Sequence, residues 1–437
     1  MNGTTANSTH LLRQINSEAL LRFALQEQVF TAAEAMAESG LTRATVLGVC
    51  DGLVAAGWLE EVEEPNAAGR GSKGRPARRY QLREAVGVVV GLDAGEGHFT
   101  TVVADLRGHE LGKRRLSVDS HALGRAGRRA SARKLVRQAL DDAGHSETAV
   151  LLTVVGVPAP VDVNGLSPAD GEFWQLMNSG FDSELQGPVL VDNDANLAAI
   201  AEGAHEPSAN VATLLTGERF GAGLIVDGNL LRGPRGGAGE MRFLGTISGN
   251  VSKPEEGSTD GFGALARKWA RSAVPSYDGK TLLRKIPGEE INAEVVFEAA
   301  REGDPLAQDI IARLGARLAH IAVVLSSLLD IDRVVIAGGI SGAIEPVLDH
   351  ARSLLPTDSG FPLPELVASR LGAEAVVQGA VELALNRIRR EPANFLPKTW
   401  ARRQQKLMSL TPVRHLARGE SERRKLPGEG RPAHDRQ

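Results

Sequence analysis

The chain has 437 residues, 42% of them hydrophobic and 24% charged, which excludes a fibrous or disordered protein and predicts two or three globular domains. Its formal net charge of −4 argues against a protein that coats nucleic acid by bulk charge. The single cysteine, Cys50, excludes an internal disulfide framework and a cysteine-rich zinc site, and 4% aromatic residues argue against base-stacking surfaces.

Neither an export signal nor a membrane span is expected from the sequence. Residues 1–10 are polar and no apolar run follows them, as a signal peptide would require. No uninterrupted apolar stretch of about 18 residues occurs anywhere in the chain. These patterns predict a soluble, cytoplasmic protein with no membrane partner.

The net charge is unevenly distributed along the chain. Residues 1–83 hold nine basic and nine acidic residues, residues 84–390 hold 30 and 40, and residues 391–437 hold eleven and five. Within the first segment, residues 66–83 contain six basic residues and no acid. A basic stripe on a small neutral domain beside a larger acidic domain is typical of a modular DNA-binding protein.

Residues 1–83 predict a winged helix-turn-helix domain. A first helix is expected to begin at Asn16-Ser17, and Thr31 with Glu34 forms a capping box for a second, which Gly40 ends. Thr42 is expected to cap a third helix, the recognition helix, which ends at Gly57. Strands at 58–62 and 80–82 would then flank a glycine- and arginine-rich wing.

The recognition helix and the wing supply the expected DNA contacts. Glycines let the wing backbone approach DNA closely, and arginines neutralise phosphates or enter the minor groove. The candidate DNA-binding residues are Thr42, Arg43, Thr45, Arg70, Lys73, Arg75 and Arg78. The alternative is a protein-docking module with a solvated basic loop; Cys50 is expected in the core of either.

Residues 84–390 show an internal duplication of strand pairs. A strand at 86–92 is followed by a turn at 93–97 and by strands at 99–104 and 111–118. A similar layout recurs at 211–216, with a turn at 217–221 and strands at 222–226 and 229–231. Two such units cradle phosphates in the actin/hexokinase superfamily, which this layout resembles. The segment is therefore expected to be a two-lobed α/β, ribonuclease H-like domain, and the whole chain a multi-domain α+β protein.

Three further segments carry residues suited to a ligand site. A strand at 189–192 leads into a helix with Asn193 and Asp194 at the junction, and a glycine-rich loop at 231–239 ends in Glu240. A third strand, 333–337, ends in Gly338 and Gly339, which allow close approach by a base or phosphate.

Together these segments resemble the ROK family, which joins sugar kinases with sugar-responsive transcription repressors. The resemblance spans roughly residues 11–390. In it, Asp93 and Gly95 match the first phosphate turn, Gly217 begins the second, and Gly338 and Gly339 match the nucleotide loop. Asn193 and Asp194 match the pair in which the aspartate acts as catalytic base in kinases, and Glu240 matches an acid that holds sugar hydroxyls. Asn178 lies where the family has a sugar-facing loop; an ordinary asparagine turn is the alternative.

Departures from the family pattern guide the functional expectation. The second phosphate turn reads Gly217-Glu218-Arg219-Phe220-Gly221 instead of Gly-Thr-Gly-x-Gly, and Glu96 alters the first turn. We expect both carboxylates to face the polyphosphate site and repel ATP. Phe243 stands where the family has a zinc-binding histidine, and residues 249–262 contain no cysteine, so zinc is predicted absent.

The sequence therefore predicts a sugar-responsive DNA-binding transcription regulator, a repressor, with three parts: 1–83, 84–390 and a basic, disordered tail at 391–437. Asp194 and Glu240 would grip a sugar or sugar phosphate; if Asp194 only caps its helix and Glu240 only pairs in the core, no sugar is bound. The expected partners are operator DNA, the effector and further copies of the chain in a homodimer or larger oligomer. The alternative is an ATP- and Mg²⁺-dependent sugar kinase with a DNA-binding appendage; otherwise no cofactor is expected.

Overall fold

The computed structural model describes residues 4–62, 77–83, 86–241, 260–356 and 363–395. One compact unit of the chain ends at Phe395, where a 3-10 turn at Pro392–Phe395 packs on the first helix; the predicted domain boundaries at residues 83 and 390 stay predictions. Residues 396–437, which contain nearly all of the predicted tail, lie outside the described residues.

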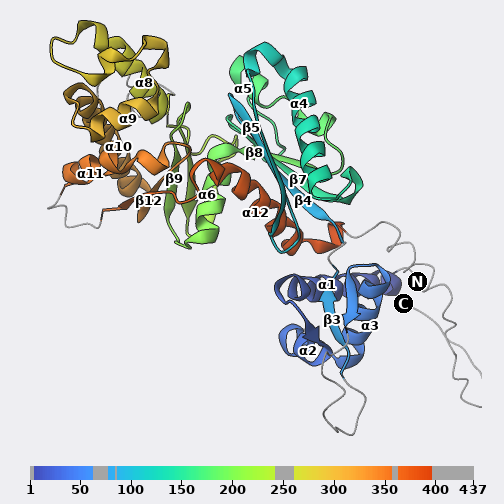
Figure 1. The fold of residues 1–437 in the computed structure, drawn as a ribbon. Coiled ribbons are helices and arrows are strands. Elements are labelled where there is room, and N and C mark those ends of the chain that lie inside the picture. Colours follow the sequence, from blue (N-terminus) through green and yellow to red (C-terminus); the bar gives the residue numbers. More distant parts are fainter. Residues whose placement is uncertain (1–3, 63–76, 84–85, 242–259, 357–362, 396–437) are drawn as a thin grey trace, which may run out of the picture. The chain divides into compact units, whose positions relative to one another are not determined.

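The N-terminal region has the element order of a winged helix-turn-helix (Figure 1). Its three helices are α1 (Thr4–Gln26), α2 (Ala32–Ser39) and α3 (Arg43–Ala55). An antiparallel sheet in the order β1-β3-β2 accompanies them, built from β1 (Phe30–Thr31), β2 (Leu59–Val62) and β3 (Arg79–Leu82). The described region omits residues 63–76, which include the predicted wing tip.

Local sequence signals set the ends of α2 and α3. Thr31 and Glu34 form the predicted capping box, and Gly40 ends α2 in the left-handed conformation, at φ 67°. Thr42 caps α3, whose buried face includes Val46, Cys50 and Leu53. The expected start of α1 at Asn16-Ser17 is wrong, since the helix begins at Thr4; no glycine or proline stands between Thr4 and Gln26 to interrupt it.

The body contains two five-stranded sheets with the same internal order, as the duplication predicted. The first has the order β6-β5-β4-β7-β8, and the second has the order β11-β10-β9-β12-β13. In each, three antiparallel strands are followed by two parallel ones. The first comprises β4 (Val88–Ala94), β5 (His98–Ala104), β6 (Glu110–Ser117), β7 (Val150–Val157) and β8 (Val189–Asn193). The second comprises β9 (Val211–Leu215), β10 (Gly221–Val226), β11 (Asn229–Leu231), β12 (Arg333–Ala337) and β13 (Glu365–Ala368).

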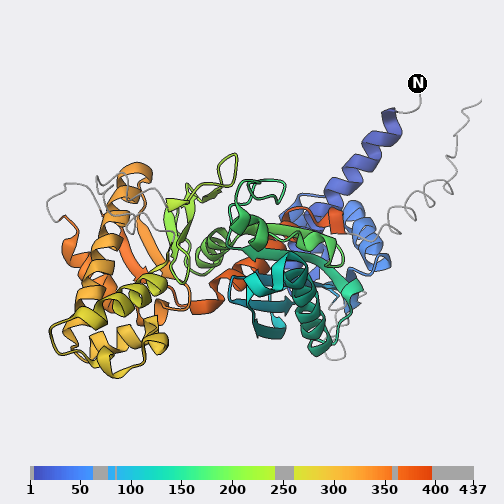
Figure 2. The ribbon, with the colours of Figure 1, turned by 90° about the horizontal axis from the view of Figure 1, so that it is seen from above.

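Two helices, α6 (Asp194–His205) and α12 (Ala375–Arg390), connect the sheets. The helix α12 packs on β4 and β7 of the first sheet, while α6 packs on β9 and β10 of the second, and the two helices contact each other (Figures 1 and 2). Because β4 is covered on both faces, all its residues are buried and its sequence is a continuous apolar run up to Asp93. The two sheets are therefore joined through one pair of packed helices.

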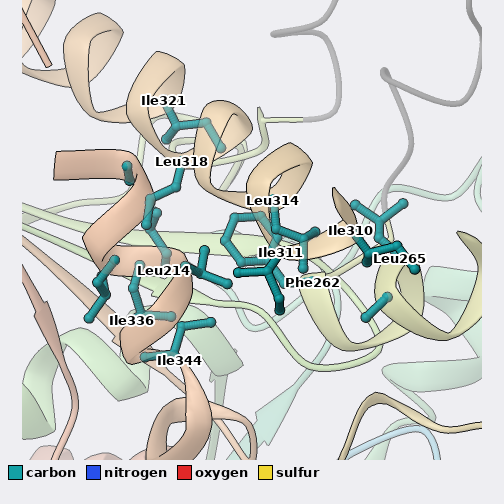
Figure 3. Close-up of a cluster of buried hydrophobic side chains, with 14 of the residues drawn as sticks. Leu214, Phe262, Leu265, Ile310, Ile311, Leu314, Leu318, Ile321, Ile336 and Ile344 are labelled. Carbon is teal, nitrogen blue, oxygen red and sulfur yellow. The ribbon is translucent and has the colours of Figure 1, made fainter. Parts of the chain in front are cut away.

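The other helices cover the sheets or contribute to the hydrophobic core beside the second sheet. They are α4 (Ser120–Asp142), α5 (Glu172–Met177), α8 (Phe262–Ala273), α9 (Ala293–Arg301), α10 (Pro305–Leu329) and α11 (Glu345–Leu354). Asn292 caps the start of α9 and Asp304 caps the start of α10. Side chains of α10 pack with Phe262, Leu214 and Ile336 in one cluster (Figure 3).

The apolar character of α10 has a structural reason. Among the described residues, α10 is the one helix long and apolar enough to cross a membrane by length and composition. A row of its side chains, including Ile310, Leu314 and Leu318, is buried in the core cluster (Figure 3). The burial of these side chains in the core cluster accounts for the high mean hydropathy of α10.

Candidate functional site

A cavity of about 510 Å³ lies at the N-terminus of α6. The ends of several elements meet there: α5 supplies two aromatic rings, the β8–α6 junction supplies polar groups, and the β9–β10 turn closes one side. Its lining includes Glu172, Phe173, Trp174, Asn193, Asp194, Arg219, Phe220 and Glu240. The fold thus brings three of the four predicted sugar residues to one cavity.

Asp194 is the first residue of α6 and carries an unusual proton affinity. Burial raises the pKa of its carboxyl from 3.8 to about 8, with further contributions from the negative charges of Asp93 and Glu240. At neutral pH the carboxyl group is therefore largely protonated. In that form it can donate a hydrogen bond to a ligand hydroxyl as well as accept one.

Asn193 holds the start of α6 in place. Its Oδ1 accepts a hydrogen bond from the backbone N–H of Asn196 at 3.1 Å, so Asn193, rather than Asp194, caps the helix. Its Nδ2 donates to the Ala159 carbonyl oxygen at 3.1 Å. The side chain lines the cavity while also fixing its wall, and direct sugar contact by Asn193 stays a prediction.

Glu240 reaches the cavity from a loop that packs closely on the second sheet. Gly239 has φ 83°, and a Cβ there would stand 1.8 Å from the Ala222 carbonyl oxygen, so only glycine fits. Arg232 in the same loop donates from Nη2 to Oδ2 of the buried Asp192 at 2.6 Å. Sequence reasoning missed Arg232, which ties the Glu240 loop to the strand that precedes Asp194.

Asn178 directly follows α5 and is not among the residues that line the cavity. Its Nδ2 donates to the Gly165 carbonyl oxygen at 2.9 Å and to Ser167 Oγ at 3.0 Å. The side chain is nearly buried and supports the loop that carries residues 165–167. Direct sugar contact by Asn178 stays a prediction. Its hydrogen bonds to the loop agree better with the alternative, an ordinary structural asparagine.

The first turn, between β4 and β5, is fixed by a buried arginine that the sequence did not reveal. Arg128 of α4 is fully buried and donates to the carbonyl oxygens of Ala94 (2.7 Å), Gly95 (2.8 Å) and Met177 (3.2 Å). Burial lowers its pKa to about 10, so it remains charged at neutral pH. The burial of Arg128 could not be predicted from sequence, because it is one of several arginines in the same stretch of α4.

Asp93, the predicted nucleotide-binding carboxylate, is buried at the end of β4. Its Oδ2 lies 3.1 Å from Nε2 of His98, the first residue of β5. The negative charge of Asp93 contributes to the raised pKa of the Asp194 carboxyl, so Asp93 and the α6 terminus lie within electrostatic range of each other. The predicted residues Asp93 and Asp194 are therefore brought together.

The surroundings of Glu218 and Glu96 differ from the repulsive charge arrangement that the sequence predicted. Glu218 accepts two hydrogen bonds from Arg267 of α8, at 2.6 and 2.7 Å, which lower the pKa of its carboxyl. Glu96 of the first turn accepts from Nε of Arg219 at 3.2 Å. Each carboxylate expected to repel phosphate thus has an arginine partner, because α8 and the opposite turn supply cations that local sequence could not indicate.

The predicted nucleotide-binding glycines lie along the second turn. Gly338, at φ 101°, follows β12, and a Cβ there would stand 3.8 Å from the backbone nitrogen of Gly217. The adjacent Thr216 N–H donates to the Ala337 carbonyl oxygen at 3.3 Å. Gly339 follows with open space at its Cβ position. The fold therefore gathers Gly217, Gly338 and Gly339, and nucleotide binding by them stays a prediction.

The candidate DNA-binding residues are only partly described. Thr42 and Arg43 are exposed at the start of α3, and the Thr42 hydroxyl accepts from the Thr45 N–H at 3.4 Å. Arg78 donates to Glu61 at 2.9 Å and to Asp51 at 2.8 Å, which raises the pKa of its guanidinium. These contacts brace α3 against the sheet. Arg70, Lys73 and Arg75 lie outside the described residues, as does Phe243.

Comparisons with known proteins agree with this arrangement. Residues 89–387 match the model of the ROK family, over more than half of the chain. A xylose repressor from Caldicellulosiruptor bescii is 23% identical over 398 residues, which cover 86% of this chain and 96% of the repressor.

Two solved structures match different shares of the chain. A ROK family transcriptional regulator, a homolog of the E. coli MLC protein, has a TM-score of 0.65 at 21% identity and covers 88% of this chain and 99% of its own. A ROK family glucokinase from Streptomyces griseus, in complex with glucose and AMPPNP, has a TM-score of 0.57 at 25% identity and covers 68% and 99%. The regulator thus shares the fold of a larger part of this chain than the kinase does.

Proposed function

The chain belongs to the ROK family, and on this basis we propose that it is a transcription regulator, acting as a repressor, that binds operator DNA and responds to a sugar. The observation that carries the proposal is the joining of a helix-turn-helix region to a kinase-like body in which Asp194 and Glu240 line a ligand-sized cavity. The xylose repressor, similar along nearly its whole length, supports both halves of the proposal.

The cavity has the chemistry that a sugar requires. Asp194 and Glu240 supply groups for hydroxyls, while Phe173 and Trp174 supply apolar faces for the C–H groups of a pyranose ring. A volume of about 510 Å³ is in the range of small-ligand sites. We propose that the effector binds here, with Asn193 and Asn178 supporting the wall.

The DNA half rests on α3 and on the wing. The exposed Thr42 and Arg43 stand at the N-terminal end of α3, the end that meets base edges and phosphates in helix-turn-helix proteins. In this proposal Thr45, Arg70, Lys73 and Arg75 add phosphate contacts, and a homodimer or larger oligomer matches a two-fold operator. We further propose a cytoplasmic protein that needs neither zinc nor another cofactor.

The contacts between the body and the N-terminal region offer a route for the response. Asp194 begins α6, α6 packs on α12, and α12 ends at Arg390, whose carbonyl oxygen accepts from Nη2 of Arg22 in α1 at 3.0 Å. Arg107 also donates to the carbonyl oxygens of Glu27 and Gln28, both at 3.4 Å. A ligand that favours one arrangement of these helices changes operator affinity by its difference in affinity for the two states.

A sugar kinase is the second candidate, and one observation favours it. With a pKa of about 8, Asp194 is deprotonated in a minor fraction of molecules at neutral pH, and that carboxylate is basic enough to remove a hydroxyl proton. Against it, Arg219 and Phe220 occupy the turn that would approach ATP phosphates. Coupled-enzyme turnover with ATP, Mg²⁺ and a hexose panel separates the two, since a kinase would lose its activity in Asp194→Asn.

The proposed function is tested by gel-shift titration with DNA from the promoter region of the protein's own gene. Specific binding at physiological salt, weakened by one member of a sugar panel, is expected. An unrelated DNA of equal length controls for bulk charge. Equal affinity for both DNAs, with or without sugars, would contradict the proposal.

A further inference from the structure

The two hairpin turns of the body are joined by an ion pair between residues far apart in sequence. Glu96 lies in the β4–β5 turn of the first sheet, and Arg219 lies at the equivalent β9–β10 turn of the second. Nε of Arg219 donates to Oε2 of Glu96 at 3.2 Å. Both residues depart from the phosphate-turn pattern that the family resemblance implies, and the departures pair with each other.

Arg219 also contacts the wall of the candidate sugar cavity. Its Cζ lies 4.0 Å from the centre of the Phe173 ring, a stacking distance for a guanidinium on an aromatic face. Phe173 and Arg219 both line the 510 Å³ cavity that contains Asp194 and Glu240. We call Glu96, Arg219 and Phe173 the inter-turn cluster.

The same arginine lines a second cavity of about 430 Å³. That cavity is lined by Glu96 and Glu218 of the two turns, by Asp260, and by Arg267 and Lys268 of α8, among others. Arg219 therefore stands between the candidate sugar cavity and the region next to the phosphate turns. A charged side chain fills a position at which the family pattern has glycine.

We propose that the inter-turn cluster is an internal substitute for a bound nucleotide: Arg219 bridges the two turns through Glu96, and a ligand in the sugar cavity acts on this bridge through Phe173. Arg219 is then a positioning residue, and the response to sugar is independent of ATP. The second half of this inference rests on the proposed function, because it takes the cavity as the effector site.

The chain offers a matched control for this ion pair. Arg267 and Glu218 form a similar arginine–glutamate pair, but both belong to the lobe of the second sheet. Breaking that pair removes comparable charges without releasing the first turn. The variants Arg219→Gln and Glu96→Gln, alone and combined, are therefore compared with Arg267→Gln.

The readout is the distance between the two sheets in the full chain. Cysteines for spin labels replace Glu110 on β6 and Asn229 on β11, two exposed positions on edge strands of different sheets. The native Cys50 is fully buried and does not compete for labelling. Pulsed electron paramagnetic resonance then reports the distance distribution, with thermal unfolding as the check that each variant is folded.

The inter-turn cluster predicts a broader or longer distribution in Arg219→Gln and in Glu96→Gln, no further change in the double variant, and no change in Arg267→Gln. Unchanged distributions in both single variants would overturn the proposal. AMPPNP with Mg²⁺ should leave the wild-type distribution as it is, and a narrowing by this analogue would overturn nucleotide independence.

Sugar binding, measured by calorimetry, separates this inference from the proposed function. A sugar that binds the wild type should shift its distribution, and its affinity should fall about threefold or more in Arg219→Gln, since contacting groups are energetically coupled. Binding without any shift would overturn the role of Phe173 as the link. If no sugar binds, the proposed effector site fails, while the single variants still decide whether the ion pair joins the turns.

Discussion

Gly379 of α12 lies so close to Leu197 of α6 that a Cβ at position 379 would stand 1.8 Å from the Leu197 carbonyl oxygen. This contact lets the helix that begins at Asp194 pack directly on the helix that ends beside α1. Only glycine permits that approach, so the contact between α6 and α12 depends on one position.

A methyl group at position 379 is expected to destabilise the protein. Gly379→Ala must push α6 and α12 apart, and overpacking of this kind costs about 1–3 kcal/mol in the free energy of unfolding. Urea denaturation measures the change. The control is Gly48→Ala in α3, another helical glycine, whose Cβ would meet no atom within 4 Å; it should be neutral or stabilising. Equal effects of the two variants would contradict the close contact.

The raised pKa of Asp194 predicts a pH-dependent stability. Because the folded protein keeps this proton up to about pH 8 while the unfolded chain loses it near pH 4, the free energy of unfolding falls as pH rises through that window. The slope from this one group is at most about 1.4 kcal/mol per pH unit. The melting temperature of Asp194→Asn, relative to wild type, should therefore rise from pH 5 to pH 8.

The exposed Asp182 provides the comparison for that measurement. Asp182→Asn should keep a nearly constant offset from wild type over the same pH range. A constant offset for Asp194→Asn as well would show that its carboxyl has an ordinary proton affinity, contrary to the burial that the structure describes.

Replacing Arg232 should weaken sugar binding and leave operator binding unchanged. Arg232→Ala leaves the buried Asp192 without its cation and releases the loop that presents Glu240. We expect about a tenfold loss of sugar affinity, given that an unpaired buried charge costs more than 1 kcal/mol, with operator affinity unchanged in the absence of sugar. Calorimetry and gel shift measure the two quantities. The exposed Arg235 in the same loop is the control, and a similar loss in Arg235→Ala would argue for a bulk charge effect.

Arg43 is expected to contribute to operator binding. Arg43→Ala should weaken binding and, if the side chain contacts phosphate, lower the slope of log affinity against log salt by about 1. Fluorescence anisotropy at several salt concentrations measures both quantities. Arg125→Ala, which removes another exposed arginine but in α4 of the body, should leave the slope unchanged. An unaltered slope in Arg43→Ala together with unaltered affinity would remove Arg43 from the interface.

Local and periodic features of the fold could be predicted from sequence. The capping box of Thr31 and Glu34 and the duplicated strand pairs both follow from short-range signals. The start of α1 was misplaced, since a polar Asn-Ser pair resembles a cap but does not stop a helix that continues through it. The short strand β1 was missed, because two residues carry no periodic signal.

The candidate site was predictable in its residues and less so in their partners. The family resemblance pointed to Asn193, Asp194 and Glu240, which line one cavity in the structure. It could not indicate that Arg219 would pair with Glu96, Arg267 with Glu218 and Arg232 with Asp192, because each pair forms only when distant elements fold together. The role of the buried Arg128 was not predicted for the same reason, since its partners are backbone carbonyl groups of the first turn and of residue 177.

We propose that a sugar bound in the Asp194 cavity and operator DNA bound at α3 alter each other's affinity for the protein. The most direct test measures that linkage both ways: operator affinity with and without saturating sugar, and sugar affinity with and without operator. The proposed coupling predicts a change of about 5- to 150-fold that is the same factor in both directions. Two intact affinities that do not alter each other would contradict it.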